Sequence, residues 1–260
     1  MVVVDHRRTS AGFALLVVPD TASAALQVAQ LLVDELQQQR QPLGLATGRT
    51  MEPVYRALVD ELAGWSSPAR ARLLGSWQSF NLDEYMGIGP GHPGSFAAYM
   101  AHHLVDPLGL DPARVCLPDG LAADPAAEAR RYSRALAAAG GIGLQLLGLG
   151  LNGHVGFNEP PCGPEAGTRV VDLCPTTRAQ NAAAFGGDPA AVPAQAITLG
   201  LAEIRAASRI VLVVTGATKA PVLTRLLQEP PSPALPASWL QGHPAVTVVA
   251  DRAALQEGPG

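Results

Sequence analysis

Four short groups of polar residues follow or end apolar runs in this sequence, and their side chains are suited to proton transfer and to anion binding. Each group lies where a buried strand would end and a turn would begin. In open parallel sheets, ligands bind beyond the carboxyl ends of the strands. We therefore expect the groups to meet in one site. They are Thr47-Gly48-Arg49-Thr50, Asn81-Leu82-Asp83-Glu84-Tyr85, residues 150–159 and Thr215-Gly216-Ala217-Thr218-Lys219.

Two of the groups carry residues that can move protons. Asp83 and Glu84 are adjacent carboxylates, and one of them can act as a general base if burial tunes its pKa. His154 can exchange protons near neutral pH, and Asn152 and Glu159 can orient its ring. The alternatives are a solvated strand end or helix N-cap for the carboxylates, and a core or surface position for the histidine.

The other two groups are typical of anion binding. A glycine turn between a strand and a helix, as at 47–50, points backbone N–H groups at an anion, and Arg49 can clamp a phosphate. Lys219 is the one lysine among 18 basic residues, and it falls in the first helical turn, where a cation is disfavoured unless an anion lies nearby. The alternatives are an ordinary strand–helix turn and a solvated surface lysine.

The elements that position these groups alternate between strand and helix patterns. Apolar runs predict strands at 13–18, 43–46, 77–82, 144–149, 209–214 and 246–250, and apolar periodicity predicts helices at 22–39, 52–63, 95–105, 124–139 and 218–228. This order predicts an α/β fold with an open, mostly parallel, doubly wound sheet and helices on both faces. We expect one domain over residues 1–260, with flexible segments at 1–9 and 256–260.

The composition narrows the classes of partner. A net charge of −4 gives no electrostatic footprint for nucleic acid, and no apolar run reaches the length of a membrane helix. The N-terminus has no signal-peptide pattern. The three cysteines and six histidines have no metal-ligand spacing. We expect a cytoplasmic protein without metal, nucleic-acid partner or membrane segment, and its oligomeric state stays open.

Together the four groups resemble those of the glucosamine-6-phosphate deaminase/isomerase family, whose relatives include the 6-phosphogluconolactonases. The similarity runs from about residue 10 to residue 252, and residues 79–85 and 148–160 carry its most specific part. The resemblance implies conversion of glucosamine 6-phosphate to fructose 6-phosphate and ammonia, without a metal or organic cofactor.

The resemblance also implies roles for individual residues. Asp83 matches the base that moves a proton between C2 and C1 of the opened sugar, and His154 matches the group that assists ring opening. Asn152 and Glu159 match residues that hold or tune this histidine. The implied phosphate contacts are Thr47, Gly48, Arg49, Thr50 and Lys219.

Three departures from the family pattern qualify this interpretation. Arg49 stands where deaminases usually have glycine or serine, and it resembles the lactonase branch. Ala183 stands where well-known members carry a phosphate-binding arginine, and we hypothesise that Arg49 replaces the lost charge. Val171 stands where regulated members carry a basic residue, so we expect no activation by N-acetylglucosamine 6-phosphate.

Three other functions compete with the deaminase interpretation. Arg49 favours a 6-phosphogluconolactonase, whereas residues 81–85 and 157–160 disfavour it. A galactosamine-6-phosphate deaminase differs only in one sugar epimer, which the sequence does not distinguish. A non-catalytic sugar-phosphate sensor is disfavoured by the presence of Asp83 and His154 and by the lack of a DNA-binding segment.

Overall fold

An open parallel sheet forms the centre of the molecule. The computed structural model describes residues 4–38 and 42–256. Within these ranges eight strands form one sheet in the order β1-β2-β11-β10-β7-β3-β4-β6, and every neighbouring pair is parallel except β1 and β2. The strands are β1 (Asp5–Arg8), β2 (Ala14–Val18), β3 (Leu43–Leu45), β4 (Ser79–Asn81), β6 (Val115–Cys116), β7 (Leu144–Gly148), β10 (Arg209–Val214) and β11 (Val246–Asp251). The predicted open, mostly parallel sheet is confirmed.

The N-terminal segment differs from the expectation. Asp5–Arg8 form strand β1 where we expected a flexible segment, because their backbone pairs antiparallel with β2 in the register His6 opposite Leu16. The exposed and charged side chains of this strand gave no alternating pattern to detect. Residues 1–3 and 257–260 lie outside the described part of the chain.

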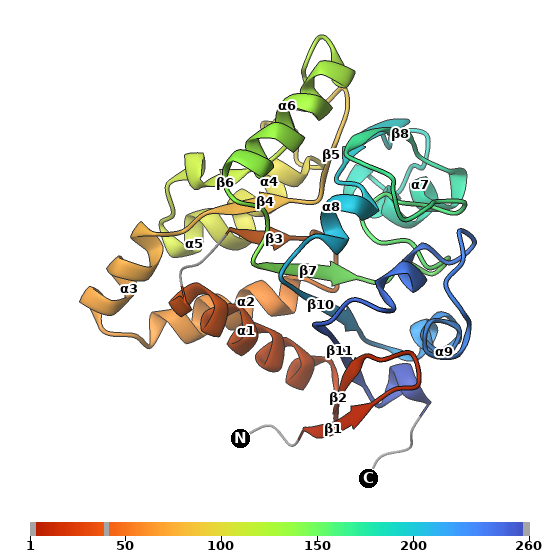
Figure 1. Cartoon of the computed structure of the whole chain (residues 1–260). Coiled ribbons are helices and arrows are strands. Elements are labelled where there is room, and N and C mark those ends of the chain that lie inside the picture. Colours follow the sequence, from red (N-terminus) through yellow and green to blue (C-terminus); the bar gives the residue numbers. More distant parts are fainter. Residues whose placement is uncertain (1–3, 39–41, 257–260) are drawn as a thin grey trace.

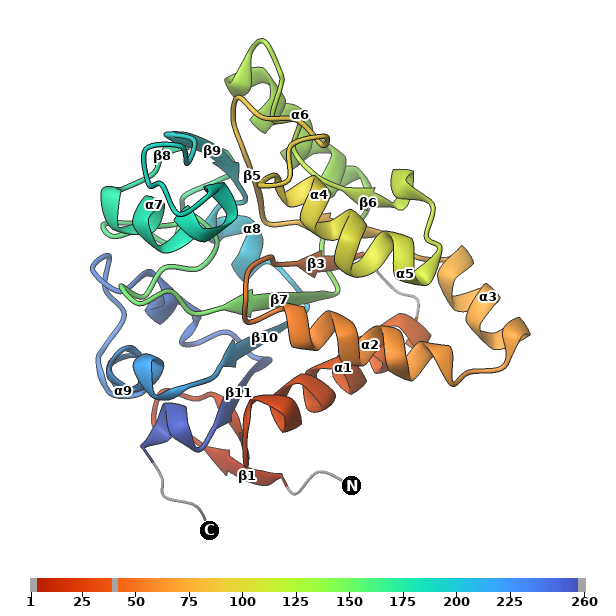
Figure 2. The same ribbon diagram turned by 180° about the vertical axis from the view of Figure 1, so that it is seen from behind.

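Helices lie on both faces of the sheet. α2, α4 and α5 are nearer the viewer in Figure 2, and α6 and α8 are nearer the viewer in Figure 1. The bounds are α1 (Thr21–Gln38), α2 (Glu52–Ala63), α3 (Ser67–Gly75), α4 (Phe96–Met100), α5 (Asp106–Leu108), α6 (Pro125–Ala138), α7 (Pro175–Asn181), α8 (Leu201–Arg205) and α9 (Ala220–Gln228). The helix predicted at 95–105 is divided: α4 is followed by a π-helical turn at Ala101–Val105.

A second, smaller sheet was not predicted. It is antiparallel, with the order β5-β9-β8, and its strands are β5 (Asp83–Tyr85), β8 (Arg169–Asp172) and β9 (Gln195–Thr198). Its apolar side has a separate core of seven buried residues: Tyr85, Phe157, Leu173, Ala182, Phe185, Val192 and Ala196. This sheet carries Asp83 and closes one side of the space above the main sheet.

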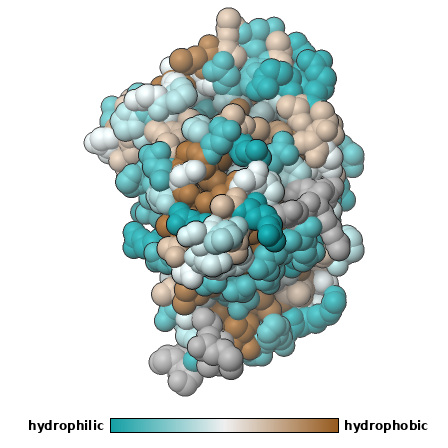
Figure 3. Space-filling model, turned by 90° about the vertical axis from the view of Figure 1, so that its left-hand side faces the viewer, coloured by the Kyte–Doolittle hydropathy of each residue, from teal (hydrophilic) through white to brown (hydrophobic). Residues whose placement is uncertain are grey.

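Apolar side chains are concentrated in the interior. The central strand β7 is buried on both faces, and its residues Leu144, Gln145, Leu146 and Leu147 are fully buried. The large hydrophobic residues that are exposed among those described are Leu26, Leu121 and Leu151. Figure 3 shows one face, where a small hydrophobic area near the centre is surrounded by hydrophilic residues. No helix in the described ranges is long and apolar enough to cross a membrane.

Candidate active site

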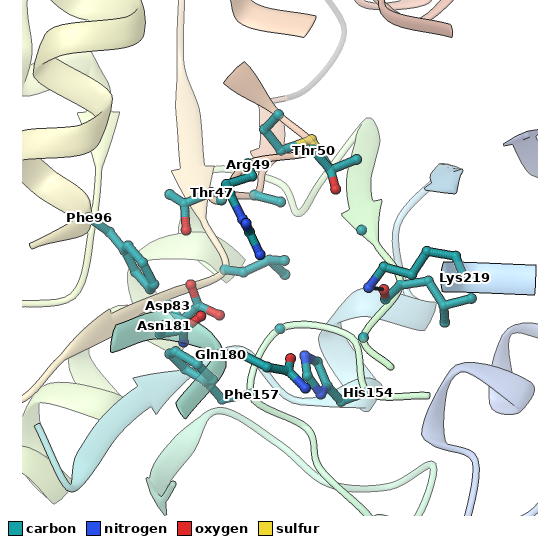
Figure 4. Close-up of a pocket in the computed structure, with 18 residues that line it drawn as sticks. Thr47, Arg49, Thr50, Asp83, Phe96, His154, Phe157, Gln180, Asn181 and Lys219 are labelled. Atoms are coloured by element: carbon teal, nitrogen blue, oxygen red, sulfur yellow. Dashed lines mark hydrogen bonds between the residues drawn. The ribbon is translucent and has the colours of Figure 1, made fainter. Parts of the chain in front are cut away.

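The four polar groups follow four neighbouring strands. β10, β7, β3 and β4 lie side by side in the sheet and are parallel, so their carboxyl ends share one edge. A cavity of ≈ 170 Å³ opens at this edge and is lined by residues of all four groups. The side chains of Arg49, Asp83, His154 and Lys219 converge on it in Figure 4. The expectation that the groups meet at one place is confirmed.

The turn after β3 presents one wall of this cavity. Gly48 has a φ of 103°, a backbone conformation that side chains disfavour, and its carbonyl oxygen accepts a hydrogen bond from the backbone N–H of Met51 at 2.8 Å. Tyr99 also donates its hydroxyl to the Gly48 carbonyl at 2.9 Å. Tyr55, in edge contact with Tyr99, donates to the carbonyl of Ala46 at 2.5 Å. The backbone that carries Thr47, Arg49 and Thr50 is thereby tied to helices α2 and α4.

Two cations, Arg49 and Lys219, line the cavity. Lys219 lies in a short 3-10 turn, Ala217–Lys219, that precedes α9, and its ammonium donates to the carbonyl of Leu149 at 2.6 Å. Burial lowers the pKa of Lys219, and the positive charge of Arg49 lowers it further. Neither cation forms an ion pair within residues 4–38 and 42–256. Like charges held together beside a cavity are stabilised by an anion between them.

Asp83 contributes a buried carboxyl group on the other side of the cavity. Asp83 is the first residue of strand β5, and only 5% of its surface is exposed to solvent. Burial raises the pKa of Asp83 to about 8, with a smaller contribution from the charge of Glu84. Gly156 passes close by, because a Cβ atom there would lie 3.3 Å from Asp83 Oδ2. The close approach of this loop keeps the carboxyl group away from bulk water.

Glu84 takes the structural role that was considered for this carboxylate pair. Its Oε1 accepts from the backbone N–H groups of Tyr85 at 2.8 Å and Phe96 at 2.9 Å, and its Oε2 accepts from Ala97 at 2.8 Å. It therefore satisfies backbone donors at the start of α4. Asp83 lines the cavity and Glu84 does not. Glu84 therefore fits the helix-capping alternative, and the general-base role of Asp83 stays a prediction.

His154 is held by Asn152 in one tautomer. The ring nitrogen Nδ1 lies 2.6 Å from Asn152 Oδ1, which also accepts from the backbone N–H of His154 at 3.2 Å. An amide oxygen only accepts hydrogen bonds, so the proton of the neutral ring is on Nδ1 and Nε2 is an acceptor. Burial lowers the pKa of His154 to about 4, although the charge of Glu159 opposes this shift. The ring packs over Gly150, where any Cβ atom would come within 2.4 Å of Nδ1.

Glu159 does not line the cavity, and within the described residues it makes no hydrogen bond to His154. Its carboxylate accepts instead from Cys174 and Thr177. Burial raises the pKa of Glu159, but these hydrogen bonds outweigh burial and leave the pKa below its usual value. Of the two predicted partners of His154, Asn152 is hydrogen-bonded to the ring, whereas the negative charge of Glu159 raises the pKa of the ring without a hydrogen bond.

Several cavity residues were missed by the sequence interpretation. Phe96, Phe157, Gln180 and Asn181 line the cavity. Figure 4 shows Phe96, Phe157 and Asn181 on the side of Asp83, and the end of the Gln180 side chain beside His154. A side-chain hydrogen bond with Asn181 lowers the pKa of Tyr85 against the larger effect of burial. Gln180 and Asn181 end helix α7, a helix that is not among those predicted from apolar periodicity.

A wider outer cavity adjoins the inner one. It has a volume of ≈ 530 Å³ and shares Arg49, Thr50 and Lys219 with the inner cavity. Ala183 lines this outer space, and its methyl group supplies no charge. No group of three or more His, Cys, Asp or Glu side chains in the described ranges is arranged to hold a metal ion.

Known proteins were compared with the chain. Residues 19–249 match the family described as glucosamine-6-phosphate isomerases/6-phosphogluconolactonase. The chain belongs to this family. A glucosamine-6-phosphate deaminase of Rhodopirellula baltica is 46% identical over 242 residues, which are 92% of this chain and 93% of the relative. A glucosamine-6-phosphate deaminase of a Geobacillus species is 43% identical over 217 residues, which are 84% of each chain.

Solved structures agree with this family assignment. A monomeric glucosamine-6-phosphate deaminase superposes with a TM-score of 0.85 and 33% identity, covering 93% of this chain and 98% of the other. A 6-phosphogluconolactonase of Trypanosoma cruzi superposes with a TM-score of 0.74 and 18% identity, covering 96% and 98%. The second likeness shows the fold alone. The family is thus one of enzymes with a shared α/β fold and at least two named activities.

Proposed function

We propose that the chain converts glucosamine 6-phosphate and water to fructose 6-phosphate and ammonia. The observation that carries the proposal is the pairing, across one small cavity, of a buried carboxyl group and a neutral histidine with two unpaired cations. The cations match a phosphate, and the other two groups match a reaction that consists of proton transfers. The deaminases that are 43–46% identical support the substrate class.

The phosphate end of the substrate is placed by the turn at 47–50. Arg49 and Lys219 supply positive charge, and the lining residues 47–51 lead directly into helix α2, whose N-terminal end favours an anion. Arg49 supplies the positive charge that is missing at Ala183. Holding one end of the sugar fixes C1 and C2 between the two proton-transfer groups, which lowers the entropic part of the barrier.

Ring opening is assigned to His154. With its proton on Nδ1, the ring presents Nε2 as an acceptor for the C1 hydroxyl proton. As that proton leaves, C1–O5 breaks, the C1 aldehyde forms, and the imidazolium returns the proton to O5. A histidine with a pKa near 4 is neutral at pH 7 and ready to accept.

The isomerisation is assigned to Asp83. As a carboxylate it takes the proton from C2 of the opened sugar and returns it to C1, while one proton of the substrate's ammonium group moves to O1. The C1 aldehyde thereby becomes a C1 hydroxyl group, and C2 becomes an iminium carbon. Water then adds to C2 and ammonia leaves. A base with a pKa of about 8 is strong enough to take a carbon-bound proton. The positive charge of the substrate's own ammonium group favours the ionised form of Asp83 when it binds.

One assay separates this function from its competitors. Purified protein is supplied in parallel with glucosamine 6-phosphate, galactosamine 6-phosphate and 6-phosphogluconolactone, and ammonia, ketose phosphate and acid release are measured. We expect ammonia and fructose 6-phosphate in equal amounts from the first substrate. Acid from the lactone alone would establish the second candidate, which Arg49 favours. Binding without any product would identify a sensor.

We also propose that the protein acts in the cytoplasm on a free sugar phosphate, without nucleic acid and without a metal or organic cofactor. The three cysteines are free, which fits a reducing compartment. The net charge of −4 gives no general attraction for polyanions. Fractionation of the source cells, with activity measured in each fraction, tests the location. Activity that survives dialysis against a chelator tests independence from metal.

A further inference from the structure

Two side chains outside the cavity hold the carboxylate of Glu159. Cys174 donates its thiol to Glu159 Oε1 at 2.9 Å and its backbone N–H to Oε2 at 3.0 Å. Thr177 donates its hydroxyl to the same Oε1. Both oxygens of Glu159 are therefore occupied by donors that come from a segment 15 to 18 residues farther along the chain.

These contacts join the two walls that flank the proton-transfer groups. Glu159 belongs to the segment that also carries His154, whereas Thr177 belongs to α7 and Cys174 precedes its first residue. The other end of α7 supplies Gln180 and Asn181 to the cavity. The carboxylate of Glu159 is thus fixed relative to a wall of the cavity and not only to its own loop.

The donors also set the charge of Glu159. Burial raises the pKa of this carboxyl group, and the hydrogen bonds of Cys174 and Thr177 more than offset that rise. An ionised Glu159 raises the pKa of His154 against the larger effect of burial. Loss of the donors would leave a half-buried carboxyl group that takes up a proton at higher pH, and the histidine would lose its negative neighbour.

We infer that Cys174 and Thr177 are positioning residues of this site: their thiol and hydroxyl keep Glu159 ionised and fixed beside His154. This inference rests on the proposed function, because it assigns His154 to the reaction. The remaining functions of the two residues, packing and closure of the start of α7, would be served by any side chain of similar volume. The positioning role depends on the hydrogen that the thiol and the hydroxyl donate to Glu159, and not on the volume of the two side chains.

Matched variants separate the donor from the volume. Thr177→Val and Cys174→Ala, alone and combined, remove the side-chain donors, whereas Thr177→Ser and Cys174→Ser keep them. Cys116→Ala removes a half-buried thiol on β6, away from the site, and serves as control. For each variant, kcat/KM for glucosamine 6-phosphate is measured as a function of pH, together with Tm.

Ionisation of Asp83, whose pKa is about 8, sets the upper part of the acid limb, and protonation of Glu159 steepens its lower part. We expect this steeper part of the limb to move to higher pH in the combined variant, by about one pH unit, because Glu159 then needs a higher pH to ionise. The serine variants and Cys116→Ala keep the wild-type limb. A uniform loss of activity at every pH, or an unmoved limb in the combined variant with Tm unchanged, would overturn the inference and leave these residues a structural role.

A second measurement does not depend on turnover. The carboxyl carbon of Glu159 is followed by NMR through a pH titration without substrate, and its resonance is assigned by its absence in Glu159→Gln. We expect a higher pKa in the combined variant than in the wild type, and a wild-type value in the serine variants. An equal pKa in all would refute the inference. If the wild type makes no ammonia, the proposed function fails, and this titration still decides whether the donors control Glu159.

Discussion

The proton-transfer side of the cavity, with Asp83 and His154, differs from the cationic side, with Arg49 and Lys219, in burial and in the contacts that hold the side chains. Asp83 and His154 lie against glycine backbone, since a Cβ atom at Gly156 would lie 3.3 Å from Asp83 Oδ2 and one at Gly150 would lie 2.4 Å from His154 Nδ1. Arg49 and Lys219, by contrast, border both the inner cavity and the wider outer one. Proton transfer requires shifted pKa values and therefore exclusion of water. Anion binding requires charge, which remains effective at a more open site.

This contrast predicts that changes on the proton-transfer side act mainly on kcat, and that changes on the cationic side act mainly on KM. Interactions made only in the transition state change kcat. Interactions that bind the substrate and the transition state equally well change KM. The substitutions below test this division, from the largest expected effect to the smallest.

Replacing the histidine is expected to have the largest effect of these. His154→Gln removes the acceptor at Nε2, and we expect kcat to fall about 10²–10⁴-fold with KM little changed. His6→Gln, on the exposed strand β1, is the control. Steady-state kinetics of ammonia release measures both. A large rise in KM with kcat intact would place His154 on the binding side and break the division.

Replacing the arginine of the turn tests the cationic side. Arg49→Ala is expected to raise KM roughly 10- to 100-fold, because a charge-assisted hydrogen bond is worth about 1.5–3 kcal/mol, while kcat stays within about a factor of two to three. Arg72→Ala, in helix α3 and away from the cavity, serves as control. An unchanged KM would show that Arg49 does not replace the charge missing at Ala183.

Stability is expected to respond to Asp83 in the opposite direction to activity. The folded state raises the pKa of this carboxyl group to about 8, so it binds more protons than the unfolded state between about pH 4 and 8. Stability from this group is therefore lost as pH rises through that window. We expect Asp83→Asn to raise Tm at pH 8, roughly 2–4 °C per kcal/mol relieved, and to have little effect near pH 4. Thermal melts at both pH values check this, and a lower Tm at pH 8 would contradict it.

The smallest effect is expected where a side chain acts only through the backbone. Tyr99→Phe keeps the ring contact with Tyr55 and removes the hydrogen bond to the Gly48 carbonyl. A neutral hydrogen bond is worth about 1 kcal/mol, so we expect KM to rise about five-fold with kcat unchanged. A fall in kcat alone would show that the turn also influences proton transfer.

The sequence was sufficient to predict the edge at which the site forms. Buried parallel strands are continuous apolar runs, so β2, β7, β10 and β11 were detectable, and the polar residues after such runs must lie at the carboxyl edge. The residues that face the cavity from that edge, Arg49, Asp83, His154 and Lys219, were predicted for the same reason.

The rest of the site depends on contacts between distant segments. The small sheet pairs Asp83 with Thr198 and Arg169 with Thr198, and its strands of three or four residues have no pattern long enough to detect. The anchoring of Glu159 by Cys174 and Thr177 arises from this packing. So does the division of roles between Asp83 and Glu84, since nothing in their adjacent positions indicates which carboxylate caps α4.

The central claim is that the buried carboxylate of Asp83 moves the proton between C2 and C1. Ammonia release from glucosamine 6-phosphate by Asp83→Asn, compared with the wild type and with the exposed control Asp60→Asn, tests it most directly. We expect the rate of Asp83→Asn to fall about 10²–10⁴-fold, with phosphate affinity retained and the control unchanged. Release of ammonia by Asp83→Asn at close to the wild-type rate would contradict the account.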